Sequence, residues 1–375
     1  MSGAYIHIPF CRQACHYCNF HFSTSLQYKD ELVAAICTEV ALTPTAANAT
    51  LETIYFGGGT PSLLPVQDIE LILKALQQQF SIVADAEITL EANPDDINPA
   101  KLQAWKAAGI NRLSVGIQSF YEEELAWMNR AHTAADALRC IVAVQKAGFT
   151  NFSIDLIYGS PLLTDTQWKK NVDLIIENKV PHISCYALTV EPATALQHMI
   201  EKKKQPPTDA EKQSRQFTLL MQWLKAAGYQ HYEISNFALP GMHSRHNSSY
   251  WQGKPYYGFG PSAHAYNGSD TRRWNIANNA QYIRQLQAGI LPCEEEKLST
   301  IQQLNEYMMI AQRTSTGIDT GYIEAHYGKQ FYNQVTQRAA KYIDTGRMQQ
   351  NNQHLLLTDE GKLFADGIAA DLFFV

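Results

Sequence analysis

The 375-residue chain lacks any long uninterrupted apolar run, internal repeat or low-complexity tract. A membrane-spanning helix needs about 20 mainly apolar residues in a row, so we expect no transmembrane segment. Long basic runs are absent too: the longest is Lys202-Lys203-Lys204, and the net charge of −6 argues against non-specific nucleic-acid binding. The first predicted strand begins almost at the first residue, so we expect no signal peptide and a reducing, cytoplasmic location.

Cysteine is scarce outside one short loop. Three of the 7 cysteines, Cys11, Cys15 and Cys18, form a C-x3-C-x2-C pattern directly after a predicted strand at residues 4–9. No second cysteine-rich pair follows, as a structural zinc site or a disulfide framework would require. Three thiolates around one metal centre leave a coordination position open for a substrate or cofactor. A zinc site completed by His16 or His21 remains the alternative.

Apolar periodicity predicts alternating strands and helices over about the first 235 residues, which favours a parallel sheet with right-handed crossovers. Six or so units are too few for a closed eight-stranded barrel. We therefore predict an α/β fold with a partial (β/α)6 barrel in residues 1–235, and a doubly wound open sheet is the alternative. Residues 236–375 are predicted as a smaller, mainly helical, winged-helix-like domain. It would begin with a long loop to residue 270 and carry a hairpin that turns at Asn351-Asn352.

Polar residues fall at or near the ends of several predicted strands. They are the run Gly57-Gly58-Gly59-Thr60, then Glu91, Gln118 and Asp155. The carboxyl ends of parallel strands are where active sites form, so these residues are predicted to share one edge of the sheet. Each has an ordinary alternative: the glycines are compatible with a tight turn, Glu91 with a solvated loop acid. The run lacks the pattern of a nucleotide P-loop.

These residues carry a family resemblance over essentially the whole chain. The cysteine loop with Tyr17, the glycine run and the β/α alternation resemble radical S-adenosylmethionine enzymes. The segments Tyr5–Cys11, Phe56–Ser62, Glu91–Pro94, Ser114–Phe120, Asn129-Arg130 and Asp155–Gly159 are similar to the branch that contains oxygen-independent coproporphyrinogen III oxidase.

The resemblance implies that the three loop cysteines hold a 4Fe–4S cluster whose fourth iron binds S-adenosylmethionine. It implies the following contacts to S-adenosylmethionine: Tyr5, Tyr17, Gly58, Gly59, Thr60, Glu91, Gln118, Arg130 and Asp155. The cofactor would then carry the radical chemistry and the protein would orient it. Taken alone, Arg130 is equally compatible with an ordinary ion pair.

Two departures separate the chain from the oxidase. Asn19-Phe20 stands where the oxidase has a further cysteine two residues after the third, and the oxidase's N-terminal extension has no counterpart. In both features the chain is similar to HemW-type heme chaperones. A further match is the motif His246-Asn247-x-x-Tyr250-Trp251, which that family associates with heme. An imidazole can ligate heme iron, and aromatic rings can stack on a porphyrin.

The resemblance therefore implies a heme chaperone that carries a 4Fe–4S cluster and S-adenosylmethionine and transfers heme to client haem proteins, including those of the respiratory chain. It also leads us to expect a homodimer, and it leaves open transient contact with membrane haem proteins. Whether the chain is an enzyme stays open: the alternative is coproporphyrinogen III oxidation or another radical reaction. A zinc-stabilised, DNA-binding regulator is disfavoured by the acidic balance and the three-cysteine loop.

Overall fold

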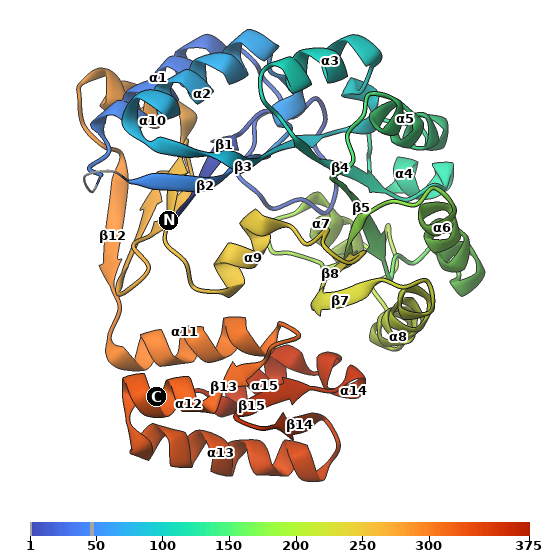
Figure 1. The fold of residues 1–375 in the computed structure, drawn as a ribbon. Coiled ribbons are helices and arrows are strands. Elements are labelled where there is room, and N and C mark those ends of the chain that lie inside the picture. The colour runs from blue at the N-terminus through green and yellow to red at the C-terminus, as the bar shows by residue number, and fades with distance from the viewer. Residues whose placement is uncertain (1, 46–48) are drawn as a thin grey trace.

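The computed structural model describes residues 2–45 and 49–375, and in this part of the chain a 12-stranded sheet carries most of the fold (Figure 1). The strands of this sheet are β1 Ser2–Ile8, β2 Thr50–Gly58, β3 Ser81–Ala92, β4 Arg112–Gln118, β5 Phe152–Tyr158, β6 His182–Ala187, β7 Gln230–Glu233, β8 Asn236–Ala238, β9 Tyr256–Phe259, β10 His264–Tyr266, β11 Thr271–Asn275 and β12 Cys293–Lys297.

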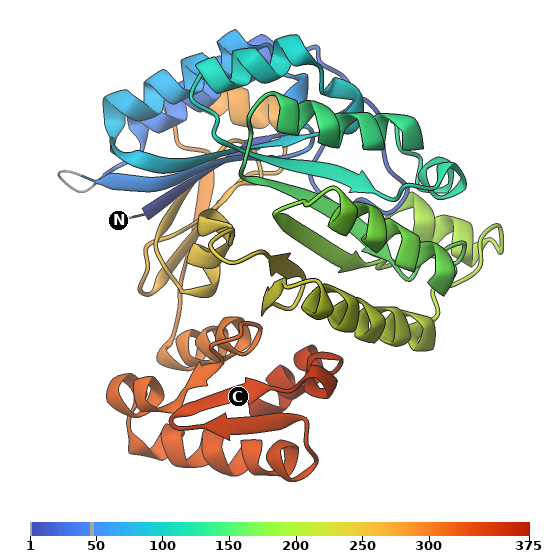
Figure 2. The same ribbon diagram turned by 45° about the vertical axis from the view of Figure 1, so that its right-hand side comes forward.

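Six of these strands, β1 to β6, lie side by side in chain order and are all parallel. The helices that connect them cover the outer face of the curved sheet (Figures 1 and 2). They are α1 Lys29–Leu42, α2 Val66–Gln79, α3 Pro99–Ala107, α4 Glu122–Trp127, α5 Ala134–Lys146 and α6 Asp165–Glu177, with α7 Ala195–Glu201, α8 Ala210–Ala226 and α10 Asn279–Gln287 following later. The predicted partial barrel is thus confirmed.

Local sequence explains where several helices begin. Asn98 accepts a hydrogen bond from the Lys101 backbone N–H, and Pro99 occupies the first turn, where a missing N–H costs nothing. Thr133 forms a reciprocal capping box with Asp136 at the start of α5. The short 3-10 turns Pro61–Leu63 and Pro94–Asp96 follow β2 and β3 directly and turn the chain at the edge where the polar residues lie.

The segment after residue 235 differs from the predicted long loop. It contains β8, helix α9 Arg245–Trp251, β9 and β10, and β9 pairs in parallel with β1. Residues 236–297 therefore extend the main sheet, and Cys293 lies in edge strand β12 instead of a loop. The boundary predicted after residue 235 does not coincide with the end of this sheet. The pattern of Asn, Ser, Gly and Tyr concealed these strands because each is short.

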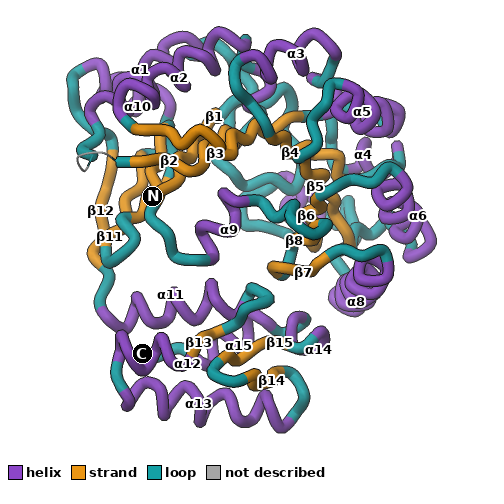
Figure 3. Tube along the Cα trace, in the orientation of Figure 1, coloured by secondary structure: helices purple, strands orange, loops and turns teal. Residues whose placement is uncertain are grey.

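The C-terminal body has its own hydrophobic core and lies below the main sheet in Figures 2 and 3. Its elements are α11 Thr300–Gln312, β13 Ile318–Asp319, α12 Thr320–Tyr327, α13 Lys329–Asp344, β14 Met348–Asn351, β15 His354–Leu357, α14 Asp359–Lys362 and α15 Ala365–Leu372. The predicted hairpin is present, but it turns at Asn352-Gln353, one residue later than predicted, with Asn352 at a φ of 52°. Among the described residues, no helix is long and apolar enough to cross a membrane.

Candidate functional site

A cavity of about 990 Å3 opens at the carboxyl ends of the parallel strands. The cysteine loop after β1 lines one side, and the ends of β2 to β6 line its floor. On the opposite side lie Arg313 and residues 362–367 of the C-terminal body. The cavity therefore lies between the main sheet and the C-terminal body, and both contribute side chains to it.

The cysteine loop is anchored to the turn between α4 and α5. The backbone N–H of His16 donates to the carbonyl of Met128 at 3.1 Å. The Asn129 side chain donates to the Ala14 carbonyl at 2.7 Å and accepts from Gln13 at 2.5 Å. Asn129 adopts a left-handed backbone conformation with φ of 58°. These contacts fix the loop from a segment more than a hundred residues away in the sequence, so the cysteines have a defined position.

Arg130 joins the loop to the floor of the cavity. Its guanidinium donates to Cys15 Sγ at 3.3 Å, to Asn93 Oδ1 at 2.7 Å and to the Gly116 carbonyl at 2.8 Å. Asn93 in turn donates to Thr60 Oγ1 at 3.3 Å, and Thr60 Oγ1 lies 3.6 Å from Cys11 Sγ. These donors beside Cys11 and Cys15 favour the thiolate form, which is the form that binds metal. Burial acts in the opposite direction and raises the pKa of the Cys11 thiol to about 11.

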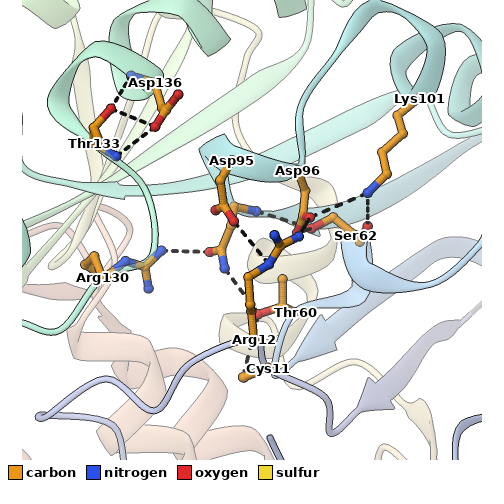
Figure 4. A network of polar contacts seen from close by, with 11 residues as sticks. Cys11, Arg12, Thr60, Ser62, Asp95, Asp96, Lys101, Arg130, Thr133 and Asp136 are labelled. Atoms are coloured by element: carbon orange, nitrogen blue, oxygen red, sulfur yellow. Dashed lines mark hydrogen bonds and ion pairs between the residues drawn. The ribbon is translucent and has the colours of Figure 1, made fainter. Parts of the chain in front are cut away.

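A second network holds the same loop from outside (Figure 4). Arg12 donates to Asp96 at 2.7 Å and pairs with Asp95 at 3.4 Å. Asp96, which is 2% exposed, also accepts from Ser62 at 2.8 Å. Both acids lie in the turn after β3, and Ser62 lies in the turn after β2, so the loop is tied to two neighbouring strand ends.

The glycine run forms a close backbone cradle. A Cβ atom on Gly59 would lie 2.7 Å from the Phe10 carbonyl oxygen, and one on Gly57 would lie 3.1 Å from Glu91 Oε1. Gly58 has a φ of 108°, which side chains rarely adopt, and its N–H donates to Glu91 Oε2 at 3.1 Å. The run is therefore more than a tight turn, because it fixes both the loop and a carboxylate.

Two carboxylates line the cavity, Glu91 and Asp155. Glu91 lies near the end of β3 and accepts from the Tyr55 hydroxyl at 2.8 Å, whereas Asp155 lies inside β5, 3.5 Å from Ser114 Oγ. Burial, together with the nearby charge of Asp155, raises the pKa of Glu91 to about 7. Burial also raises the pKa of Asp155 to about 6. Both groups can therefore change their protonation state near neutral pH.

Some polar atoms at the cavity lack a partner within the described residues. They include Oε1 of Gln118 and Nε of Arg130. Gln118 is also strained, with a φ of 68° at the last position of β4. Unsatisfied buried atoms and backbone strain both cost free energy, and they concentrate where a ligand supplies the missing partner.

The structure brings most of the predicted site residues together. Those lining the cavity are Cys11, Cys15, Tyr17, Cys18, Gly58, Gly59, Thr60, Glu91, Gln118, Arg130 and Asp155. Tyr5 differs: it lies below the cavity, against Tyr55, and its hydroxyl contacts His7 Nδ1 at 3.1 Å. Tyr5 is not among the residues that line the cavity, so its contact with S-adenosylmethionine stays a prediction.

The four residues of the predicted heme motif lie elsewhere, in and around helix α9. His246 is 1% exposed, and both ring nitrogens are hydrogen-bonded, Nδ1 to Thr53 Oγ1 and Nε2 to the Tyr250 hydroxyl, each at 2.8 Å. Asn247 lies in the first turn, where its N–H donates to Ser244. Trp251 packs under the guanidinium of Arg313, 5.4 Å from its ring. Trp251 is thus linked to the cavity lining through Arg313.

The zinc alternative requires four ligand atoms that converge on one point. Among the described residues, no three Cys, His, Asp or Glu side chains converge in this way. His16 Nδ1 contacts the Trp127 carbonyl at 2.8 Å, and His21 Nε2 contacts Asn279 at 2.8 Å. The arrangement does not fit mononuclear zinc. A 4Fe–4S cluster holds its ligand sulfurs farther apart, because each sulfur binds a different iron.

Sequence reasoning missed several residues of the site. Asn93 connects Arg130 with Thr60, but the sequence marks it only as a member of the segment Glu91–Pro94. Its signal was its position two residues after Glu91, directly after the end of β3. Arg313 and Tyr186 also line the cavity, but no local pattern marks them. Arg313 arrives through the tertiary arrangement of the C-terminal body alone.

Family models match two parts of the chain. The model of the radical SAM superfamily matches residues 5–175, which hold the cysteine loop and all the cavity strands up to β5. The model of the HemN C-terminal domain matches residues 298–364. The second match begins close to the start of α11, where the main sheet has ended.

Curated relatives extend the similarity to nearly the full chain. The heme chaperone HemW of Bacillus subtilis is 32% identical over 98% of this chain and 98% of its own. HemW of Synechocystis sp. is 37% identical over 84% of this chain and 79% of its own. Among solved structures, coproporphyrinogen III oxidase (HemN) from Escherichia coli, a radical SAM enzyme, has a TM-score of 0.86 at 24% identity and covers 99% of this chain and 89% of that one. This last likeness concerns the fold.

Proposed function

The chain belongs to the HemW family of radical SAM proteins, and from this premise we propose that it is a heme chaperone. It would bind heme and pass it to client haem proteins, including respiratory ones, while carrying a 4Fe–4S cluster and S-adenosylmethionine. The single observation that carries the proposal is the match to HemW over 98% of both chains. Similarity of that extent includes the cavity, the α9 segment and the C-terminal body together.

The residues at the cavity fit a cluster and its ligand on structural grounds. Three cysteine sulfurs line one wall, and the hydrogen bonds of Thr60 and Arg130 reach two of them. Thiolates are the usual ligands of iron–sulfur clusters. We assign Cys11, Cys15 and Cys18 as the cluster ligands. When bound, such a cluster with S-adenosylmethionine supplies one-electron chemistry at its open iron.

The remaining residues would bind and orient S-adenosylmethionine. The unpaired Oε1 of Gln118 offers an acceptor to a hydroxyl or amino group, and Arg130 offers an unpaired N–H. Glu91 and Asp155 would hold negative charge near the sulfonium. The C-terminal residues 362–367 close the cavity opposite the loop and would exclude water from the bound ligand.

Heme binding at the α9 motif is a prediction that the family resemblance supports. In the present arrangement a heme iron would reach His246 only after the imidazole left Thr53 or Tyr250. Asn247, Tyr250 and Trp251 would follow the same movement because they share the helix. A cytoplasmic location, a homodimer and transient contact with membrane haem proteins belong to the same proposal.

A paired experiment tests the function. The protein is reconstituted with iron and sulfide without oxygen and titrated with hemin, and heme transfer to an apo-haem protein is then followed by absorbance. In parallel, coproporphyrinogen III is supplied with S-adenosylmethionine and a reductant. We expect saturable heme binding, transfer to the acceptor, and no protoporphyrinogen IX.

Two results would overturn the proposal. One is sustained oxidation of coproporphyrinogen III to protoporphyrinogen IX over many turnovers. The other is the absence of saturable heme binding both with and without the cluster. Inductively coupled plasma analysis of the purified protein completes the test, because stoichiometric zinc without iron would remove the cluster assignment.

A further inference from the structure

Three aromatic rings are stacked in a row beneath the cavity. The Tyr5 and Tyr55 rings are 6.1 Å apart with an interplanar angle of 26°, and the Tyr55 and His246 rings are 4.9 Å apart at 24°. Tyr55, the middle ring, donates its hydroxyl to Glu91 Oε1 at 2.8 Å. A residue of the predicted heme motif is therefore separated from a cavity carboxylate by one side chain.

The outer ring, His246, is rigidly held. Besides the contacts of its two ring nitrogens, its backbone N–H donates to Glu87 Oε1 at 3.0 Å. A Cβ on Gly3 would lie only 3.3 Å from the imidazole, so strand β1 also packs against it. Burial lowers the pKa of His246 to about 3, so the ring is neutral at physiological pH. A neutral, fully hydrogen-bonded histidine is a packing element with fixed geometry.

Because His246 is held in place, it restrains Tyr55, and Tyr55 in turn fixes the Glu91 carboxylate. Because the Tyr55 ring is confined between two other rings, its hydroxyl cannot swing away from Glu91. The second oxygen of Glu91 accepts from the Gly58 N–H at 3.1 Å. With both oxygens anchored, the carboxylate presents its remaining lone pairs to the cavity in one orientation. Removal of the imidazole would leave a space into which Tyr55 could tilt.

We propose that His246 is a positioning residue for the Glu91 carboxylate, acting through the stacked ring of Tyr55. Helix α9 thereby serves the S-adenosylmethionine site from below. The inference rests on the proposed function in one respect, which is the assignment of Glu91 as a contact of S-adenosylmethionine.

The experiment compares two substitutions at one position. His246→Ala removes the ring, whereas His246→Phe keeps a ring for stacking but cannot ligate iron. We expect His246→Ala to weaken S-adenosylmethionine binding about tenfold, the equivalent of one lost hydrogen bond to a charged group. His246→Phe should restore affinity to within about threefold of the parent protein, because stacking survives. Hemin affinity is measured on both variants as well, and the positioning role is judged from S-adenosylmethionine affinity.

S-adenosylmethionine affinity is measured by equilibrium dialysis on the reconstituted protein, and by the change it causes in the EPR spectrum of the reduced cluster. Circular dichroism and iron content establish that each variant is folded and loaded. His243→Ala is the matched control, because this nearby histidine is exposed and stacks on Tyr232 instead of Tyr55. It should leave both affinities unchanged.

Tyr55→Phe tests the second step independently, and also serves if His246→Ala fails to fold. The titratable groups facing Glu91 are Tyr5 from β1, Tyr55 from β2, Asp155 from β5, Tyr186 at the end of β6 and Tyr250 from α9. Only Tyr55 donates a hydrogen bond to the carboxylate among these. Its loss should weaken binding and move the pH of half-maximal S-adenosylmethionine affinity upward. Tyr229→Phe, which loses a buried hydroxyl contact to the Val180 carbonyl outside the site, should not.

The outcomes separate the inference from the proposed function. Loss of hemin binding in both His246 variants, with unchanged S-adenosylmethionine affinity, would overturn the positioning role and make His246 a heme ligand. Unchanged S-adenosylmethionine affinity in His246→Ala, or in Tyr55→Phe, would also overturn it. Failure of the parent protein to bind hemin would remove the chaperone proposal, whereas the positioning role would still stand or fall on the S-adenosylmethionine measurements.

Discussion

The cavity and the α9 segment were both predicted as ligand sites, but their polar groups differ in one respect. At the cavity, Gln118 and Arg130 keep polar atoms without partners within the described residues, and Gln118 carries backbone strain. In α9, both nitrogens of His246 have partners and its side chain is buried, whereas Nε1 of Trp251 has no partner within the described residues. The comparison teaches that His246, unlike Gln118 and Arg130, has no hydrogen-bonding capacity left for a ligand in this arrangement. Its predicted role as a heme ligand therefore requires a rearrangement of α9.

The largest effect is expected at the cavity, where removal of one cysteine should prevent cluster binding. Cys15→Ser removes a thiolate whose hydrogen bond from Arg130 marks it as a ligand. We expect loss of nearly all bound iron and sulfide after anaerobic reconstitution, measured by chemical analysis and EPR. Cys293→Ser, at edge strand β12 and away from the cavity, is the control and should retain the full iron content. Equal iron content in both variants would contradict the cluster assignment.

A large but smaller effect is expected from Arg130→Met. The guanidinium holds Cys15, Asn93 and the Gly116 carbonyl together, and it has an N–H left for a ligand carboxylate. Loss of these charge-assisted contacts should weaken S-adenosylmethionine binding about a hundredfold, or roughly 2.7 kcal/mol. Isothermal titration calorimetry measures the affinity. Arg139→Met removes a guanidinium that is 70% exposed, and parental binding is expected there. A similar loss in both variants would speak against a specific role.

The third prediction concerns pH. The pKa of Glu91 in the folded chain is about 7, above its ordinary value of 4.5, so the folded state holds this proton more tightly than the unfolded chain. The free energy of unfolding of the ligand-free protein should therefore fall as pH rises from about 4.5 through 7, by at most about 3 kcal/mol. The loss will be smaller than this limit because one edge of the carboxylate faces the open cavity.

Urea titrations across this pH range measure the effect, and Glu91→Gln should flatten the curve. Binding of S-adenosylmethionine should change in the opposite direction, since the sulfonium favours ionised carboxylates and affinity should rise toward pH 8. An affinity that falls with rising pH would contradict the placement of Glu91 and Asp155 beside the ligand's positive charge.

The smallest effect is expected on stability, from a change at a glycine that lines the cavity. Gly59→Ala places a Cβ 2.7 Å from the Phe10 carbonyl, and we expect it to destabilise the protein by about 1–3 kcal/mol. Gly367→Ala, in helix α15 with no atom near the new Cβ, should instead stabilise it by about 0.5–1 kcal/mol. Thermal unfolding of the two variants measures the difference. Equal melting temperatures would mean that the glycine cradle is not close-packed.

The sequence predicted what depends on local pattern. Periodicity gave the six parallel strands and their helices, and Asn351-Asn352 gave the C-terminal hairpin. The motif residues, from the cysteine loop to Asp155, converge on one cavity because parallel strands bring their carboxyl ends to one edge. These parts needed no knowledge of distant contacts.

What the sequence did not predict depends on long-range packing. Strand β9 is only four residues long and pairs with β1, so nothing local identified it. Arg313 reaches the cavity from the C-terminal body, and His246 is enclosed by Thr53 and Tyr250. An exposed loop histidine and a buried, stacked one have the same letter in a sequence. Whether the histidine is exposed or buried depends on the packing of strands β1 and β2 against α9.

The central claim is that the cavity holds a three-cysteine cluster with S-adenosylmethionine on its open iron. Electron–nuclear double resonance on the reduced, reconstituted protein tests it most directly, with S-adenosylmethionine isotopically labelled in its amino and carboxylate groups. The account predicts hyperfine coupling between the labelled nuclei and the cluster, which Cys15→Ser abolishes. A cluster spectrum that is identical with and without labelled S-adenosylmethionine, under conditions where dialysis shows saturation, would contradict it.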